Sequence, residues 1–241
     1  MVGSKGMSSH GVHQATFRNL HGTLPVEKPG MTDRPPRYLI PASPHGVEEV
    51  IRKSRFITEA DHAPDAETAQ AFVARIREKF PDATHHCWAY VAGPPGSTTL
   101  IGMSDDGEPH GTAGRPMLTA LLHGDVGEIV AVCSRYYGGT KLGTGGLSRA
   151  YSGGVKLLLE SLPTKEHVER VILRVVVDYG SVDTLQRPFT EAEVVIESQD
   201  FGENVEYRLS VPREYAESLA DAVAGVTSGR GIVQPISPDG S

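Results

Sequence analysis

The five apolar residues at positions 129–133, IVAVC, constrain the fold of this chain more than any other segment. A strand that is apolar on both sides is typical of the centre of a sheet that is covered on both faces. A glycine-rich segment at 138–146 follows, and then Leu147, Ala150 and Tyr151 recur at the spacing of an amphipathic helix. The segment therefore predicts a central strand, a tight loop and a helix packed on the sheet.

The rest of the chain reads as two consecutive units. The first is expected to hold strands within 47–60, a helix that starts after Asp65 and ends before Pro81, strands at 84–91 and 100–104, and helices that open at Gly114 and Gly145. Pro163 and Thr164 are expected to end this unit, with a junction near 163–166. The second unit reads strand, helix, strand, strand, helix, strand at 168–177, 182–189, 193–198, 205–211, 214–224 and 231–236. This βαββαβ order is the ferredoxin-like pattern, so the sequence predicts an α+β protein.

Composition favours a globular cytoplasmic protein. Of 241 residues, 39% are hydrophobic and 22% are charged, which is enough apolar material for a core. No run of eighteen apolar residues and no secretory signal is present, so we expect no membrane partner. Cys87 and Cys133 lie in apolar, strand-like contexts and are interpreted as buried free thiols. The first thirty residues, 1–30, have no periodicity and are expected to be a disordered extension.

Charge is unevenly distributed along the chain. The net charge of −7 argues against a protein that coats nucleic acid non-specifically. Residues 165–236 carry seven Lys and Arg against thirteen Asp and Glu. Residues 129–159, by contrast, contain no acid and carry Arg135, Lys141, Arg149 and Lys156. The first unit is therefore expected to present a local positive surface.

The glycine-rich loop is the candidate binding site within that surface. It is not a phosphate-binding Walker A loop, because no Lys-Ser/Thr pair follows Gly143, and it does not match GxGxxG. A loop of this kind at a helix start offers backbone N–H groups to an anion. The alternative is a tight turn with a purely structural role. The candidate anion-binding or RNA-binding residues are Arg135, Gly138, Gly139, Lys141, Gly145, Gly146 and Arg149.

A second cluster supplies polar neighbours for this site. Its members are His85, His86, Asp105, Asp106, Glu108 and Thr112. Carboxylates and histidines at this density could hold a metal ion. Alternatively, Asp106 and Gly107 form a turn, while the carboxylates cap the helix after Gly111 or pair with Arg135 and Arg149. His85 and His86 face opposite sides of a strand, so only one can join a given site. We assign no catalytic residue, metal ligand or cofactor here.

Four motifs resemble the YigZ/IMPACT family. They are SRFI at 54–57, ATHHCWAY at 83–90, SDDGEPHGTAGRPML at 104–118 and RYYGGTKLGTGGLSRAY at 135–151. The resemblance spans residues 45–162 as the IMPACT N-terminal domain, and residues 165–236 resemble the C-terminal module of bacterial YigZ-type members. His86 stands where Asn is common in the family, and Ser134 stands where Thr is usual. The resemblance implies an N-terminal module like domain 2 of ribosomal protein S5 and a C-terminal module like domain V of elongation factor G.

The leading hypothesis is a cytoplasmic, non-enzymatic binding protein that acts near translation. Its partner would be RNA, the ribosome or a translation-related protein, bound through the glycine-rich basic surface, and no DNA partner is expected. The alternative is a metal-assisted hydrolase or phosphate-handling enzyme. That enzyme would use His85 or His86 with Asp105, Asp106 and Glu108 around a metal ion.

Overall fold

The computed structural model describes residues 37–237, which form two compact units, residues 37–168 and residues 169–237. The expected disordered extension, residues 1–30, lies outside the described residues. Each unit has its own hydrophobic core, which is the main physical requirement for a domain.

The first unit is built on a five-stranded antiparallel sheet with the order β2-β3-β6-β4-β5. Its strands are β2 (His45–Ile51), β3 (Ser54–His62), β4 (His85–Val91), β5 (Ile101–Ser104) and β6 (Ile129–Tyr136). The middle strand is β6, and seven of its eight residues are buried. The prediction of a central strand covered on both faces is therefore confirmed.

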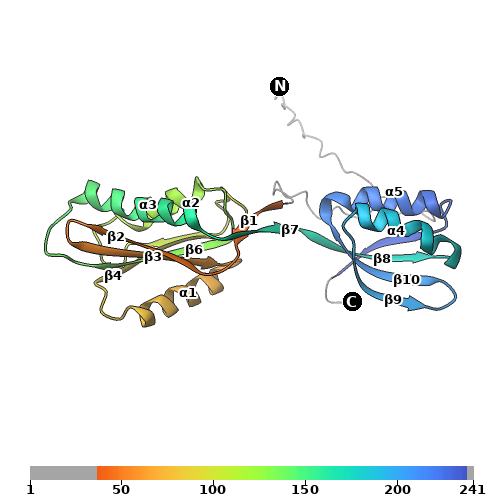
Figure 1. Cartoon of the computed structure of the whole chain (residues 1–241), viewed down its shortest axis with the longest axis horizontal. Coiled ribbons are helices and arrows are strands. Elements are labelled where there is room, and N and C mark those ends of the chain that lie inside the picture. The colour runs from red at the N-terminus through yellow and green to blue at the C-terminus, as the bar shows by residue number, and fades with distance from the viewer. Residues whose placement is uncertain (1–36, 238–241) are drawn as a thin grey trace, which may run out of the picture. The chain divides into compact units, whose positions relative to one another are not determined.

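Helices cover both faces of this sheet. Helix α1 (Ala66–Lys79) packs on one face, and α2 (Gly114–Leu122) and α3 (Thr144–Ser161) pack on the other (Figure 1). Successive residues of β6 alternate between the two cores, so that Val132 faces α1 while Cys133 faces α2 and α3. The predicted cap of α1 is confirmed, because the Asp65 side chain accepts a hydrogen bond from the backbone N–H of Thr68 at 2.7 Å.

Two neighbouring glycines of α3 have opposite surroundings. A Cβ atom at Gly154 would lie 2.5 Å from the hydroxyl oxygen of Thr58 on β3, closer than real atoms approach. A Cβ atom at Gly153 would meet nothing within 4 Å. Gly154 therefore allows α3 to approach the sheet closely, whereas Gly153 only adds flexibility to the helix.

We expect substitution of these two glycines to change stability in opposite directions. Gly154→Ala should lower the free energy of unfolding by about 1–3 kcal/mol through overpacking. Gly153→Ala should raise it by about 0.5–1 kcal/mol, because alanine is the better helix former. Urea unfolding followed through Trp88, the only tryptophan, reports on this unit. Equal effects of the two substitutions would contradict the close packing of α3 on β3.

The junction between the two units lies further along the chain than the sequence indicated, because a two-stranded ribbon extends the first unit. Strands β1 (Arg37–Pro41) and β7 (Thr164–Val168) pair antiparallel, and the unit boundary falls between Val168 and Glu169. Residues 163–166 are therefore part of the first unit. The side chains of Thr164, Lys165 and Glu166 are polar and exposed, so β7 is held by backbone pairing that the side-chain pattern does not show.

The carboxylate of Glu128 holds this ribbon to the main sheet. It accepts a hydrogen bond from the hydroxyl of Tyr38 on β1 at 2.7 Å and pairs with the imidazole Nε2 of His62 on β3 at 2.6 Å. His167 on β7 lies 3.9 Å from the same carboxylate and stacks on the ring of Tyr38. Burial would raise the pKa of Glu128, but the hydrogen bonds with His62 and Tyr38 hold that pKa below its ordinary value.

This lowered pKa has a consequence for acid stability. A carboxyl whose pKa is depressed in the folded state stabilises the fold above its unfolded pKa and loses that contribution as the pH falls through the folded pKa. We expect Glu128→Gln to lower the free energy of unfolding at neutral pH by about 1–3 kcal/mol, as for a charged hydrogen bond. Urea unfolding at several pH values should show the gap between wild type and Glu128→Gln closing under acid conditions. A gap that does not depend on pH would contradict this role.

The second unit has the predicted order of strands and helices. Its elements are β8 (Arg170–Val177), α4 (Val182–Glu191), β9 (Val195–Phe201), β10 (Val205–Pro212), α5 (Ala216–Val226) and β11 (Ile232–Ile236). The antiparallel sheet has the order β11-β8-β10-β9, and α4 and α5 lie on one of its faces (Figure 1). The helix expected from residue 214 begins at Ala216, because Arg213–Tyr215 form a 3-10 turn. The structure is thus of the α+β class.

Among residues 37–237, no helix combines the length and the apolar character needed to cross a membrane.

Candidate functional site

A buried ion pair lies beneath the glycine-rich loop. The guanidinium Nη1 of Arg135, at the end of β6, is 2.5 Å from the carboxylate Oε1 of Glu108. The hydroxyl of Tyr151, on α3, donates to the same oxygen at 2.7 Å, and Arg135 Nη2 donates to the hydroxyl of Ser54 at 3.3 Å. The side chains of Arg135 and Glu108 are only 6% and 3% exposed, so each charge depends on the other for compensation.

This geometry corrects the expectation that Arg135 belongs to the surface with Lys141 and Arg149. The acid-free segment suggested three cations in one exposed group, but Arg135 points into the core and is already paired. Arginine is suited to this position, because its planar group can donate to several acceptors at once. Its role here is to hold the first unit together.

The two thiols lie in the same core. Cys87 and Cys133 are both buried and free, as the sequence predicted. The structure adds that they stand opposite each other in the register of β4 and β6. Burial raises the pKa of Cys133 to about 12 and also raises that of Cys87. The Cys87 thiol donates to the backbone oxygen of Asp105 at 2.9 Å. Burial likewise raises the pKa of the Tyr151 hydroxyl. All three groups therefore remain protonated, and Cys87 and Tyr151 serve as hydrogen-bond donors.

The three clustered carboxylates point to three different structural partners. Asp105 accepts from the backbone N–H groups of Gly111, Ala113 and Gly114 and so caps the start of α2. Burial would raise the pKa of Asp105, but these hydrogen bonds hold it below its ordinary value. Asp106 accepts from Arg77 and from a backbone N–H, while Glu108 is in the buried pair. Within residues 37–237, no group of three or more His, Cys, Asp or Glu side chains is arranged to hold a metal ion.

The two histidines and Thr112 also have local roles. His85 Nδ1 lies 2.8 Å from the backbone oxygen of Asp106, and His86 Nδ1 lies 2.9 Å from the hydroxyl of Ser134. They face opposite sides of the sheet, as predicted, and burial lowers the pKa of His86. The hydroxyl of Thr112 donates to the backbone oxygen of Pro109 at 2.6 Å. The contacts of His85 and Thr112 shape the 104–114 segment, whereas the contact of His86 with Ser134 joins β4 to β6.

At several positions of the loop, the backbone conformation or the close packing admits only glycine. Gly139 and Gly143 have φ angles of +80° and +75°, which side-chain-bearing residues rarely adopt. A Cβ atom at Gly138 would overlap the backbone of Lys53 in the turn between β2 and β3. Gly145 and Gly146 lie in the first turn of α3. That turn contains no acidic residue, and no side chain caps it. The structural and anion-binding interpretations of this loop are therefore compatible.

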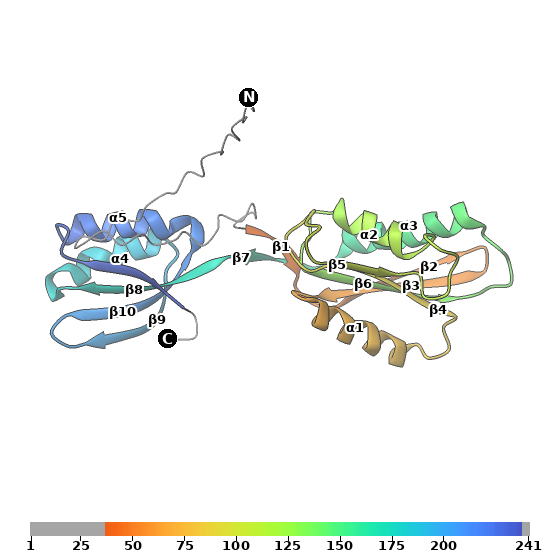
Figure 2. The ribbon, with the colours of Figure 1, turned by 180° about the vertical axis from the view of Figure 1, so that it is seen from behind.

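The close contact at Gly138 brings two further cations next to the glycine-rich loop, where the sequence alone did not place them. Arg52 and Lys53 form the turn between β2 and β3, with φ angles of +46° and +68°. Figures 1 and 2 show this turn beside the loop between β6 and α3. Arg52 and Arg149 also line one shallow hollow of about 210 Å³. The basic cluster Arg52-Lys53-Ser54-Arg55 could have indicated these two cations in the sequence, but only the fold places it beside the loop.

We call Arg52, Lys53, Lys141 and Arg149 the basic patch. All four residues are exposed, and none forms an ion pair with another residue of the described chain. Neighbouring Arg55, by contrast, is paired with Glu48 at 2.6 Å. Glu49 is the acidic residue that lines the same hollow as Arg52 and Arg149. The patch thus offers positive charge that no ion pair within residues 37–237 neutralises, although Glu49 lies nearby.

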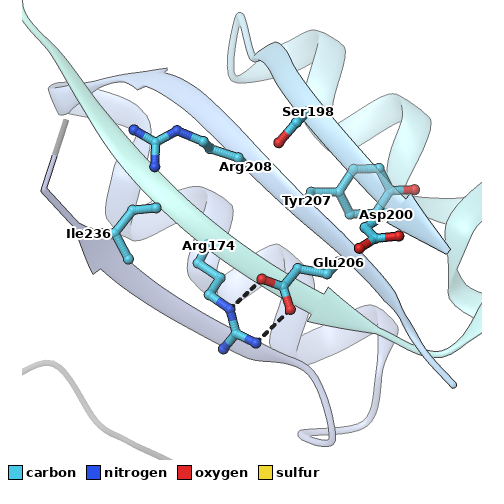
Figure 3. Close-up of a pocket in the computed structure, with 7 residues that line it drawn as sticks. All are labelled: Arg174, Ser198, Asp200, Glu206, Tyr207, Arg208 and Ile236. Carbon is cyan, nitrogen blue, oxygen red and sulfur yellow. Dashed lines mark hydrogen bonds and ion pairs between the residues drawn. The ribbon is translucent and has the colours of Figure 1, made fainter. Parts of the chain in front are cut away.

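A second hollow, of about 310 Å³, lies on the sheet of the other unit (Figure 3). Its Arg174 forms a two-point pair with the Glu206 carboxylate, with both distances 2.5 Å. The pair with Arg174 lowers the pKa of Glu206. Arg208 also lines the hollow and pairs with Glu197 at 2.8 Å. The cations of this surface are therefore already matched by acids, unlike those of the basic patch.

The chain belongs to the IMPACT family. Residues 52–159 match the Impact N-terminal domain, and residues 175–230 match a domain of unknown function, DUF1949. An IMPACT family member of Haemophilus influenzae is 45% identical over 82% of this chain and 96% of its own length. The IMPACT family member YigZ of Escherichia coli is 43% identical over 78% and 94%. A crystal structure of a hypothetical protein is 40% identical, with a TM-score of 0.61, over 84% of this chain and 98% of that one.

We expect the buried and the exposed arginine to respond differently to truncation. Arg135→Ala should lower the free energy of unfolding by about 3–5 kcal/mol, because it leaves the Glu108 charge buried without its partner. Arg149→Ala, an exposed control on the same segment, should stay within about 0.5 kcal/mol of wild type. Urea unfolding followed through Trp88 makes the comparison. Similar small losses in both variants would show that Arg135 is not buried as described.

Proposed function

We propose that this IMPACT family member is a non-enzymatic RNA-binding protein whose basic patch contacts phosphate groups. The observation that supports this most is that four exposed cations gather around one glycine-rich loop and form no ion pair within the described residues. Unpaired Lys and Arg side chains bind nucleic acid by displacing counterions from phosphates. Arginines such as Arg75 and Arg77, which are paired with Asp61 and Asp106, are less available for this.

We further infer that both units have folds that recur in translation proteins. The order β11-β8-β10-β9 is the strand order of the ferredoxin-like fold, to which domain V of elongation factor G belongs. The first unit is assigned to the fold of domain 2 of ribosomal protein S5. These assignments favour a cytoplasmic role close to the ribosome. Because a fold does not define a function, the proposal rests on the patch.

The metal-assisted hydrolase receives no geometric support. Asp105, Asp106 and Glu108 are engaged in a helix cap, a surface ion pair and a buried ion pair. A catalytic metal would need several of these carboxylates to converge with a histidine. Their side chains point to different partners instead.

The proposal is tested by the salt dependence of RNA binding. We expect Lys141→Ala to weaken binding of a fluorescent single-stranded oligoribonucleotide and to reduce the slope of log K against log salt concentration by about one unit. Lys165→Ala is the matched control, because Lys165 is also exposed and forms no ion pair within the described chain. It should leave both affinity and slope unchanged. Fluorescence anisotropy at several salt concentrations measures both quantities.

Two results would contradict RNA binding by the patch. One is that the wild-type protein does not bind the oligonucleotide at any salt concentration, and the other is that the Lys141→Ala and Lys165→Ala variants have the same affinity and slope. Either result would favour a protein partner for this surface. Thermal unfolding of both variants should match wild type, since exposed lysines contribute within about 0.5 kcal/mol.

A further inference from the structure

Tyr137 is the exposed aromatic residue that opens the glycine-rich loop. It follows directly after β6, and 49% of the residue is accessible to solvent. Its backbone N–H donates to the hydroxyl of Thr84 at 3.3 Å. The backbone N–H of the next residue, Gly138, donates to the hydroxyl of Ser54 at 3.2 Å. The backbone that carries the ring is therefore attached to the ends of two other strands.

The ring itself lies against the buried ion pair. The guanidinium carbon of Arg135 is 5.5 Å from the centre of the Tyr137 ring and 5.3 Å from the centre of the Phe56 ring. Glu108 and Ser54 hold that guanidinium in place. A cation at this distance attracts the electron-rich face of an aromatic ring. Tyr137 is thus an exposed ring that is held from beneath, so that it loses little conformational freedom when a ligand covers it.

The ring is also next to the basic patch. Gly138, its neighbour in the chain, packs against the backbone of Lys53, and Lys141 lies in the same loop. Proteins that bind single-stranded RNA combine cations that contact phosphates with aromatic rings on which unpaired bases stack. A duplex keeps its bases inside the helix and cannot use such a ring.

We propose that Tyr137 stacks on an unpaired base of single-stranded RNA whose phosphates contact the basic patch. This inference rests on the proposed function and specifies the form of RNA that the site accepts. Other exposed aromatic residues are placed differently. Tyr179 and Phe201 stack on each other in the acidic second unit, and Tyr179 donates to the backbone oxygen of Gly202. Tyr137 is the one that combines an exposed ring with neighbouring unpaired cations in the described chain.

The experiment compares two probes that carry the same phosphates. One is a single-stranded oligoadenylate, and the other is an oligonucleotide of the same length whose sugars lack bases. We expect wild-type protein to bind the oligoadenylate about 5- to 150-fold more tightly than the abasic probe. This is the loss of affinity expected when one stacked base is removed. Tyr137→Ala should weaken oligoadenylate binding by a similar factor and leave abasic binding unchanged. Tyr137→Phe should bind like wild type, because the ring is kept.

Tyr179→Ala is the matched control, since it removes an exposed tyrosine from the other unit and should not change either affinity. Thermal unfolding checks that the variants remain folded. We expect the Tyr137→Phe variant, which loses only the hydroxyl, to unfold at the wild-type temperature. Equal affinity of wild type and Tyr137→Ala for oligoadenylate, with salt-dependent binding retained, would overturn the stacking proposal and leave RNA binding by the patch intact. Failure of wild type to bind either probe would overturn both.

Discussion

The buried ion pair between Glu108 and Arg135 is the interaction on which the candidate surface depends. It joins the 104–114 segment to the end of β6, and Tyr151 and Ser54 extend it to α3 and β3. Removing either charge would leave the other without compensation inside the core. Because Arg135 is held in this way, it supports the ring of Tyr137 from beneath rather than binding a ligand itself. The proposed binding is assigned to the basic patch, whose cations form no ion pair within residues 37–237.

Short-range patterns in the sequence predicted most of the scaffold. The apolar run at 129–133 identified the central strand, Asp65 identified the start of α1, and the order of periodic segments identified βαββαβ in the second unit. The burial of Cys87 and Cys133 followed from their apolar neighbours in the same way. Each of these features is set by residues a few positions apart, so that side-chain periodicity and capping preferences were sufficient.

The features that sequence reasoning missed depend on distant segments. Arg135 and Arg149 look equivalent in the acid-free stretch, and only the fold shows that Arg135 meets Glu108, 27 residues away. Arg52 and Lys53 reach the loop because the turn that connects β2 to β3 lies beside it, where Gly138 allows close approach. Strand β7 was missed because backbone pairing with β1 leaves no side-chain pattern. In each case the partner is brought in by topology rather than by local chemistry.

We expect ligand contacts to be confined to one end of the first unit. An amide NMR titration with a single-stranded oligoribonucleotide tests this most directly, because it reports on every part of the chain at once. Shift changes should concentrate at Lys53, Tyr137, Lys141 and the first turn of α3, with smaller changes elsewhere in the first unit. Changes concentrated on β8 and β10, around Arg174 and Glu206, with residues 137–149 unaffected, would contradict it.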